Sequence, residues 1–249
     1  TAARLYDEMD FQRATQAYIW ALPAIGFKAL YDAQAKTLGT KNGDVLMYQD
    51  LKDKAGMLTP NITTLYAFSF WDLAAQGPLV VDVPAGLTAG GVMDIWQQPL
   101  CDMGQTGPDK GAGGKYLILP PGHPGVDAPD HRIFQSPSNQ VWFGTRGLDP
   151  DKAVAEATVK QHRLYSWNDR ANPPVSQYVG VGGRAWESAQ PNTLDYWRLL
   201  AELYANEPVA PRDRMMFGML KPLGIEPGKP FAPDARAAKI LTDAAQVGE

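Results

Sequence analysis

Residues 58–121 read LTPNITTLYAFSFWDLAAQGPLVVDVPAGLTAGGVMDIWQQPLCDMGQTGPDKGAGGKYLILPP. Short runs rich in β-branched and aromatic residues alternate there with turns of Gly, Pro and Asp, which is the pattern of consecutive strands. Within residues 64–73 the odd-numbered side chains share one face, and Tyr66, Phe68 and Phe70 share the other. Because both faces are largely apolar, we expect a strand that is covered on both sides.

The strand pattern continues along the chain to about residue 148. Segments of the same kind, each bounded by turn residues, are PLVVDVP (78–84), GGVMDIWQ (90–97), GKYLILPP (114–121), HRIFQ (131–135) and QVWFGTRG (140–147). Their number and spacing are typical of a sandwich or barrel.

Helical periodicity precedes and follows these strands. Apolar residues recur every three to four positions from Arg4 to about Leu38, and Pro23 predicts a kink or a break there. Asp149 or Asp151 can cap a helix that runs to about Tyr165. Further helices are expected after Asn192 or Thr193, after Pro211 and after Pro233.

The order of these elements predicts an α+β fold, because strands and helices are segregated along the chain and do not alternate. We expect an antiparallel β-sandwich core flanked by an N-terminal helical segment and a C-terminal helical subdomain. The expected boundaries are 1–55 for the first helical segment, 56–148 for the sandwich and 149–249 for the helical subdomain.

Composition excludes some classes of function. The chain has 249 residues, of which 45% are hydrophobic and 20% charged, and its formal net charge is −4. An acidic chain without a cluster of Lys and Arg is a poor binder of nucleic acid, so no nucleic-acid partner is expected. No apolar run approaches the roughly 20 residues that span a bilayer, so no transmembrane segment is expected either.

The first candidate site is the turn before the first long strand. Asn61 and Thr63 can present an amide and a hydroxyl to a ligand, and Tyr66 adds a stacking face with a polar tip. The alternative is that Asn61 and Thr63 hold the turn through hydrogen bonds to the backbone, and turn chemistry favours this interpretation.

The second candidate site contains Asp94, Trp96, Gln97 and Asp102. In an extended segment Asp94 and Trp96 share one face, where a carboxylate beside an indole can hold a sugar or another polyol. Burial beside the ring can also make Asp94 or Asp102 a general acid or base. The alternative is a core tryptophan beside a buried aspartate that accepts backbone N–H groups.

Other motifs carry no recognisable chemistry. The Gly-rich stretch 107–115 lacks the spacing of a phosphate-binding loop and predicts a hairpin or lid loop. The three histidines, His123, His131 and His162, are too scattered for a zinc pattern. We therefore expect neither a metal nor a cofactor.

Five segments resemble a bacterial family known as domain of unknown function 1254. They are DFQRATQAYIWALPAIG (10–26), LTPNITTLYAFSFWDL (58–73), GPLVVDVPAG (77–86), MDIWQQPLCDMGQTGPDKGAGGKYLILPPG (93–122) and FGMLKPLGIEPGKPF (217–231). The resemblance implies a β-sandwich flanked by a helical subdomain, and export to the periplasm or to the medium. It also implies a partner, a jelly-roll domain of unknown function 1214 that usually follows and that would be absent here or cleaved off. Where the family often has Asn-x-Asp-Thr, residues 61–64 read NITT, so one carboxylate is absent.

Three hypotheses for the function follow. The leading one is an exported protein that binds a small polar or carbohydrate-like ligand at the rim of the sandwich. The second is a hydrolase that uses Asp94 or Asp102 as general acid/base, with a site completed by the C-terminal partner domain. The third is a structural or assembly module that docks onto its partner domain or forms a homo-oligomer, because aromatic-rich strands that lose a packed neighbour expose apolar surface.

Overall fold

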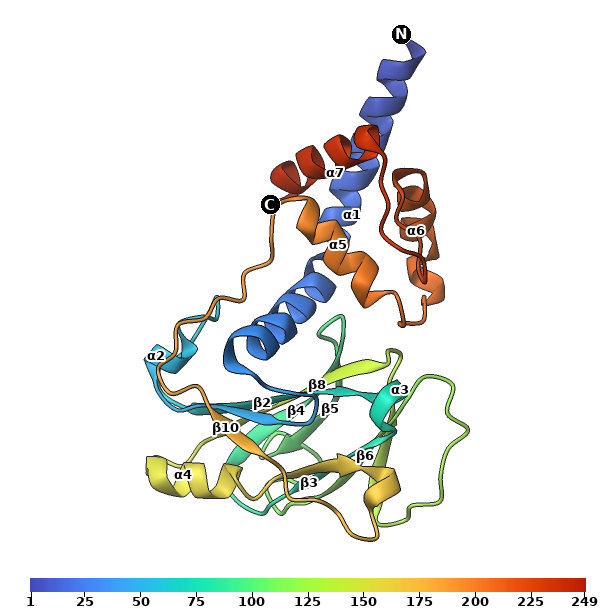
Figure 1. The fold of residues 1–249 in the computed structure, drawn as a ribbon. Helices are drawn as coiled ribbons and strands as arrows, with labels where there is room; N and C mark the ends of the chain where they lie inside the picture. The colour runs from blue at the N-terminus through green and yellow to red at the C-terminus, as the bar shows by residue number, and fades with distance from the viewer. The chain divides into compact units, whose positions relative to one another are not determined.

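The computed structural model describes all residues from Thr1 to Glu249, and the chain forms two compact units. The first unit contains residues 1–30 and 189–249, and the second contains residues 31–188. Helices from both ends of the chain make up the first unit, whereas all the strands lie in the second (Figure 1). The division into three segments expected from the sequence is a different partition, and it stays a prediction.

The larger sheet of the second unit has six strands. Their spatial order is β10 (Tyr178–Gly180), β1 (Val45–Tyr48), β2 (Leu65–Asp72), β8 (Gln140–Gly147), β4 (Thr88–Asp94) and β5 (Pro99–Gly104). Neighbouring strands pair antiparallel except β1 and β10, which run parallel. Strands β2 and β8 pair along their whole length and form the centre of the sheet.

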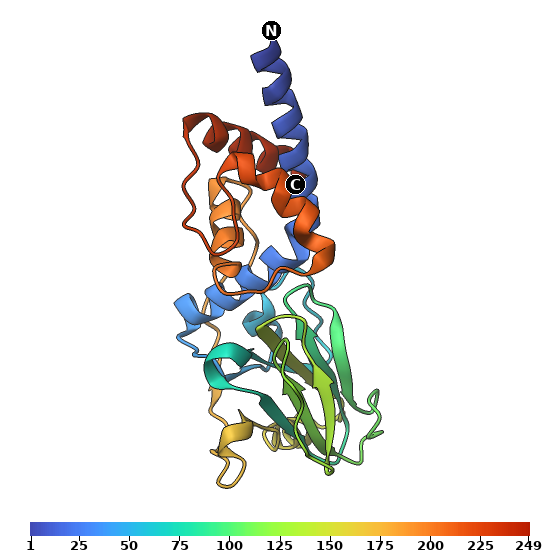
Figure 2. The ribbon, with the colours of Figure 1, turned by 90° about the vertical axis from the view of Figure 1, so that its right-hand side faces the viewer.

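The smaller sheet has four strands. Their spatial order is β7 (His131–Gln135), β6 (Gly114–Leu119), β3 (Leu79–Val83) and β9 (Arg163–Ser166). Only the pair β6–β7 is parallel, and it lies at one edge. Both sheets are open, and Figure 2 shows the strands of this unit from the side. The predicted sandwich flanked by helices is confirmed, with one parallel pair at an edge of each sheet.

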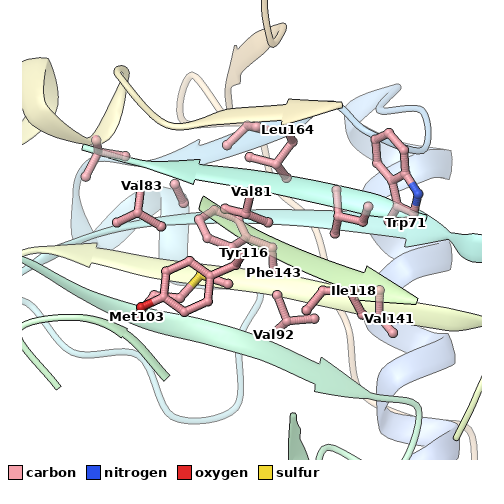
Figure 3. Packing of buried hydrophobic residues seen from close by; sticks show 14 of the residues in the cluster. Trp71, Val81, Val83, Val92, Met103, Tyr116, Ile118, Val141, Phe143 and Leu164 are labelled. Atoms are coloured by element: carbon pink, nitrogen blue, oxygen red, sulfur yellow. The ribbon is translucent and has the colours of Figure 1, made fainter. Parts of the chain in front are cut away.

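The two sheets pack on each other through alternate residues of their strands. Val81 and Tyr116 from the smaller sheet belong to the same buried cluster as Val92, Val141 and Phe143 from the larger sheet (Figure 3). All five are at most 1% exposed. The strand alternation predicted from the sequence therefore describes a core between two layers.

Three short helices of the second unit begin where an aspartate caps them. Helices α2 (Leu51–Lys54), α3 (Leu73–Gln76) and α4 (Lys152–Val159) follow Asp50, Asp72 and Asp151. The Asp50 side chain accepts a hydrogen bond from one backbone N–H group of the first turn, and those of Asp72 and Asp151 accept from two each; these groups otherwise lack an acceptor.

The prediction of a helix up to about Tyr165 is wrong, because α4 ends at Val159. The next three residues turn the chain, and His162 Nδ1 lies 2.9 Å from the Val159 carbonyl oxygen. Strand β9 follows and pairs with β3, with Leu164 in the core and Tyr165 on the other face of the sheet. Pairing with β3 therefore overrides the local helical periodicity. A short 3₁₀ turn, η2 (Trp167–Asp169), follows β9.

Helix α1 (Ala2–Ala33) begins in the first unit and continues through Pro23 without a break. Of the kink or break predicted at Pro23, the break is therefore wrong, and the kink stays a prediction. Pro23 has no N–H to donate to the carbonyl of Ile19, so the helix loses one backbone hydrogen bond there and continues. A π-helical turn, η1 (Gln34–Leu38), extends α1 and ends at Gly39, whose φ of 75° is a common helix terminus.

The first unit is completed by the C-terminal helices. They are α5 (Leu194–Leu203), α6 (Arg214–Leu220) and α7 (Ala235–Gly248), with the 3₁₀ turns η3 (Pro211–Asp213) and η4 (Lys221–Leu223) on either side of α6. Thr193 caps α5, as predicted. The rings of Tyr18 and Tyr196 stack with centroids 4.0 Å apart, and Trp197 Nε1 donates to the Leu241 carbonyl at 2.7 Å. None of the helices in the protein is both long and apolar enough to pass through a bilayer.

Candidate functional site

A groove on the outer face of the six-stranded sheet is the candidate site. Its volume is about 310 Å³, and we call it the outer groove. It lies over β2, β8, β4 and β5, which run side by side (Figure 1), and it reaches the loop after β5. Its lining residues are Phe68, Ala89, Gly90, Gly91, Met93, Pro99, Cys101, Asp102, Thr106, Trp142, Gly144, Thr145 and Arg146.

Strand register explains why the sheet is hollow at this place. Phe68 on β2 lies opposite Gly144 on β8, Gly144 opposite Gly91 on β4, and Gly91 opposite Asp102 on β5. This row therefore has an aromatic side chain at one end, a carboxylate at the other and two residues without side chains between them. Since adjacent strands are about 4.8 Å apart, roughly 14 Å separate the Cα atoms of Phe68 and Asp102.

The two glycines of the floor have different surroundings. A Cβ atom on Gly144 would lie 3.0 Å from Trp142 and 3.1 Å from Phe68, so it would point into the groove between these rings. A Cβ atom on Gly91 would lie 2.3 Å from the Cys101 carbonyl oxygen, which the paired backbone cannot avoid. The floor therefore needs glycine at position 91 and uses glycine at position 144 to keep the groove open.

Apolar side chains form one wall of the groove. The rings of Phe68 and Trp142 meet edge to face, with centroids 5.1 Å apart and an interplanar angle of 84°. Met93 lies opposite Trp142 on the next strand. Trp142 Nε1 is buried and has no hydrogen-bond partner in the protein. The wall thus offers packing surface together with one unused donor.

Polar side chains border the other parts of the groove. Asp102, Thr106 and Arg146 are all exposed. Neither the Asp102 carboxylate nor the Arg146 guanidinium forms an ion pair or a hydrogen bond with the rest of the protein. Both groups are therefore available to a molecule in the groove.

The Arg146 guanidinium lies over the ring of Tyr66, with Cζ 4.9 Å from the ring centroid. Lys54 Nζ lies 4.5 Å from the same centroid and donates to the carbonyls of Asn61, at 3.1 Å, and Thr64. Burial, followed by the positive charges of Lys152 and Arg146, lowers the pKa of Lys54. Two cationic groups therefore share one aromatic ring at this end of the groove.

The predicted residues Asn61 and Thr63 form a turn. Asn61 Oδ1 accepts hydrogen bonds from the backbone N–H groups of Thr63 and Thr64, both at 3.2 Å, and the Asn61 N–H donates to the Tyr66 hydroxyl at 3.2 Å. Thr63 lines a separate cavity of about 150 Å³ beside α4. These contacts match the turn interpretation, and a ligand-binding role for Asn61 and Thr63 stays a prediction.

Asp94, Trp96 and Gln97 lie at the turn between β4 and β5. Asp94 is completely buried, and its Oδ1 accepts from the N–H groups of Trp96, at 2.8 Å, and Gln98, at 2.9 Å. The expectation that Asp94 and Trp96 share one face of an extended segment is wrong, because the strand ends at Asp94 and Gln97 has a φ of 58°. None of the three lines the outer groove. Their site roles stay predictions.

The Gly-rich loop closes one end of the groove through Thr106. It is not a hairpin, because it connects β5 in the larger sheet with β6 in the smaller one. Buried Asp109 holds the loop by accepting hydrogen bonds from Gly104 N at 2.9 Å, Gly113 N at 3.3 Å and the Tyr116 hydroxyl. A loop with such internal bonding can present Thr106 at a fixed place.

The structure thus brings one predicted residue, Asp102, into the groove and places a second, Tyr66, beside Arg146. Sequence reasoning missed the aromatic wall, Phe68 and Trp142, as a binding surface. Both belong to segments identified as strands, and the signal that could have found them is the glycine two positions after Trp142 on the same strand face.

Comparison with known proteins identifies a fold and a family. No curated protein matches the sequence. Among solved structures, the VPA0106 protein from Vibrio parahaemolyticus is similar, with a TM-score of 0.68, 15% sequence identity and coverage of 96% of this chain. The chain spans 57% of the length of that protein, and at this identity the similarity concerns the fold alone. A family model described as protein of unknown function (DUF1254) matches residues 42–166, half of the chain. The chain belongs to the DUF1254 family.

Proposed function

We propose that this protein is an exported binding protein that holds a small polar or carbohydrate-like ligand in the outer groove. The observation that carries the proposal is the pair of facing glycines between Phe68 and Asp102. An apolar body can pack on the aromatic wall while Asp102, Thr106 and Arg146 bind the polar groups of the same molecule.

The size of the groove limits the size of the ligand. Sites for small molecules usually measure about 300–1,000 Å³. The outer groove, at about 310 Å³, lies at the lower end of that range. It suits one monosaccharide, polyol or amino acid and is too small to enclose an oligomer.

Binding is favoured over hydrolysis because the groove contains a single carboxylate. Glycosidases generally use two carboxyl groups on either side of the bond that is broken, and here Asp102 is alone. Cys101 also borders the groove, but burial raises its pKa to about 12, so at neutral pH it is a thiol and a poor nucleophile. Asp102 is therefore assigned to ligand binding.

A groove-filling variant tests the proposal. Calorimetry with a panel of monosaccharides, polyols and amino acids should find at least one ligand for the wild type. In Gly144→Val, the new side chain projects between Phe68 and Trp142, and binding of that ligand should weaken at least about tenfold, which corresponds to about 1.4 kcal/mol.

The matched control is Gly180→Val. Gly180 lies on β10 of the same sheet, and no atom lies within 4 Å of the place that its Cβ would take. This variant should bind like the wild type. If the whole panel fails to bind to the wild type, or if both variants bind equally well, the outer groove is not the binding site.

Export and the partner domain are further parts of the proposal. The partner domain is supported by the greater length of the Vibrio protein, of which this chain spans 57%. Export is carried over from the resemblance of the five quoted segments to the family. An antibody raised against residues 31–188 should detect the native protein in the periplasmic or secreted fraction of its host. The detected protein should have a mass above 27.2 kDa or be associated with a second chain. Detection in the cytosol alone would contradict export.

A further inference from the structure

Helix α1 carries a regular row of exposed positions along the part that belongs to the first unit. Steps of three and four residues connect these positions, and every one of them is exposed: Ala2, Leu5, Met9, Gln12, Gln16 and Ile19. This is the heptad spacing of a coiled coil, in which two positions in every seven residues meet a neighbouring helix. We call these six positions the α1 seam.

The seam contains large apolar side chains that the chain itself leaves uncovered. Leu5 is 64% exposed, Met9 37% and Ile19 56%. Buried residues of the same part of α1, such as Ala14 and Tyr18, lie on the opposite side of the helix. The first turns of α1 also extend beyond α7 (Figures 1 and 2). A single exposed apolar residue needs no partner, but a row of them at heptad spacing predicts a second helix.

Charged residues beside the seam indicate which helix this is. In a parallel pair of helices, a residue just before one seam position meets the residue five places later on the other helix. Glu8 and Arg13 have this separation, and they flank Met9 and Gln12. Two copies of α1 side by side therefore bring each Glu8 next to Arg13 of the other copy, which gives two attractive pairs.

Both charges can take a second partner. Within one chain, Glu8 Oε1 accepts from Arg4 Nε at 3.0 Å, and Arg13 Nη1 lies 3.3 Å from Asp10 Oδ1. Contacts of this kind between exposed groups contribute little to stability. The carboxylate has a second oxygen and the guanidinium has further N–H donors, so a contact with another copy does not require these pairs to break.

An antiparallel pair would bring like charges together. Alignment of Leu5 with Met9 of the other copy places the two Glu8 side chains next to each other, and alignment of Met9 with Ile19 does the same for Arg13. In the parallel pair, Gln12 instead meets Gln12 of the other copy, where two amides can hydrogen-bond. Polar residues in a seam fix the register of the helices.

The length of the seam sets the strength of the contact. At about 1.5 Å per residue, residues 2–19 span about 27 Å. A strip of this length on two helices buries on the order of 1,000 Å² in total, which is at the lower limit for specific association. We therefore expect a dimer that exchanges with the monomer at micromolar concentrations.

We infer that the α1 seam is a dimerisation surface, which binds the same seam of a second copy in a parallel, two-fold symmetric coiled coil. A second copy is favoured over a different protein because the charges that flank the seam are complementary to themselves. This inference is independent of the outer groove.

Sedimentation equilibrium of the 249-residue chain tests it. Between about 1 and 200 μM the mean mass should rise from 27.2 kDa towards twice that value. Leu5→Gln should raise the dissociation constant at least about tenfold. The matched control is Met215→Gln, on α6 of the same unit, because Met215 is 70% exposed and lies outside the seam. This variant should dimerise like the wild type.

Charge reversal tests the self-complementary flanks. Glu8→Arg leaves only arginine at the two flanking positions, and Arg13→Glu leaves only glutamate, so each variant alone should dimerise at least about tenfold more weakly than the wild type. An equimolar mixture should form a heterodimer, because each arginine then meets a glutamate. Recovery on mixing also shows that both variants are folded.

Cross-linking tests the direction. Gln12→Cys should form a disulfide-linked dimer under oxidising conditions, because position 12 meets itself in the parallel pair. Ala3→Cys, exposed but outside the seam, should not. The native Cys101 is buried and does not compete.

A monomeric mass at every concentration would overturn the inference and leave the seam to another occupant, such as the partner domain. Equal dimerisation of Leu5→Gln and Met215→Gln, or no heterodimer on mixing the charge variants, would also overturn it. A dimer that Gln12→Cys does not cross-link would overturn the parallel arrangement.

Discussion

The Lys54 amine lies 4.5 Å from the centre of the Tyr66 ring while it donates to the carbonyls of Asn61 and Thr64. Lys54 is 1% exposed, which is rare for a lysine. One side chain therefore ties α2 to the turn before β2 and to the aromatic ring that lies beside Arg146. The packing of α2 against the turn before β2 therefore depends on a buried cation.

Removing that cation should loosen the turn. Lys54→Met keeps most of the apolar stem but leaves two carbonyls without their donor, so we expect a loss of about 1–3 kcal/mol in the free energy of unfolding. Urea denaturation measures the change. Lys52→Met, on the exposed side of the same helix, is the matched control and should stay within about 0.5 kcal/mol of the wild type. Equal stability of both variants would contradict a structural role for the Lys54 amine.

Stability should fall in mild acid because of His162. Burial lowers the pKa of this residue from 6.5 to about 4. Between these values the unfolded chain binds a proton that the folded protein does not, so stability decreases as the pH falls from about 6.5 towards 4, by up to about 3 kcal/mol. His162→Asn can keep a donor for the Val159 carbonyl but does not titrate. Its free energy of unfolding, measured between pH 7 and 4.5, should therefore fall less steeply than that of the wild type, and parallel curves would exclude His162 as the cause.

The two glycines of the groove floor should respond differently to alanine. In Gly91→Ala the new methyl group overlaps the Cys101 carbonyl oxygen, so strands β4 and β5 must shift. We expect a loss of about 1–3 kcal/mol or more, as in other overpacked sites. In Gly144→Ala the contacts are with side chains of Phe68 and Trp142, and the cost should stay below about 1 kcal/mol. Thermal unfolding of both variants tests this prediction, which requires that Gly91→Ala lowers the melting temperature more than Gly144→Ala.

The bonding of Asp109 should be cooperative. Asp109→Asn removes one of two acceptor oxygens from a buried site that serves Gly104, Gly113 and Tyr116, with an expected loss of about 1.5–3 kcal/mol. Tyr116→Phe removes one donor and should cost about 1 kcal/mol. Because the two groups contact each other, the double variant should lose less than the sum of the single losses. Strict additivity would show that the hydroxyl and the carboxylate are not coupled.

The strands of the sandwich could be predicted because their alternation is local. The alternation within residues 65–72 predicts which side chains share each face of the strand. In the structure, Leu65, Ala67 and Trp71 share the face that packs into the core. The continuation of α4 to Tyr165 was wrong because the pairing of β9 with β3 is made with a segment about 80 residues away. Pro23 does not end the helix, because one lost hydrogen bond within a long helix is tolerated.

The site was harder to predict because the register between strands decides it. Phe68, Gly144, Gly91 and Asp102 come from four separate strands, and nothing within any one segment shows that they form a row. Asp94 and Trp96 attracted attention as neighbours in sequence, but the chain reverses direction between them and Pro99. Asp102 could be identified because a carboxylate is a recognisable functional group. The residues that surround it could not be identified, because they come from other strands.

Strand β10 covers the edge of β1 although it comes more than a hundred residues later in the chain. The matched family segment, residues 42–166, stops before this strand. A truncated protein limited to that segment would leave the amides and carbonyls of β1 open to any other extended chain, which invites polymerisation strand by strand. In the folded protein, Tyr178 to Gly180 occupy the hydrogen-bonding edge of β1, so the edge strand of the sheet is this three-residue strand and no longer β1.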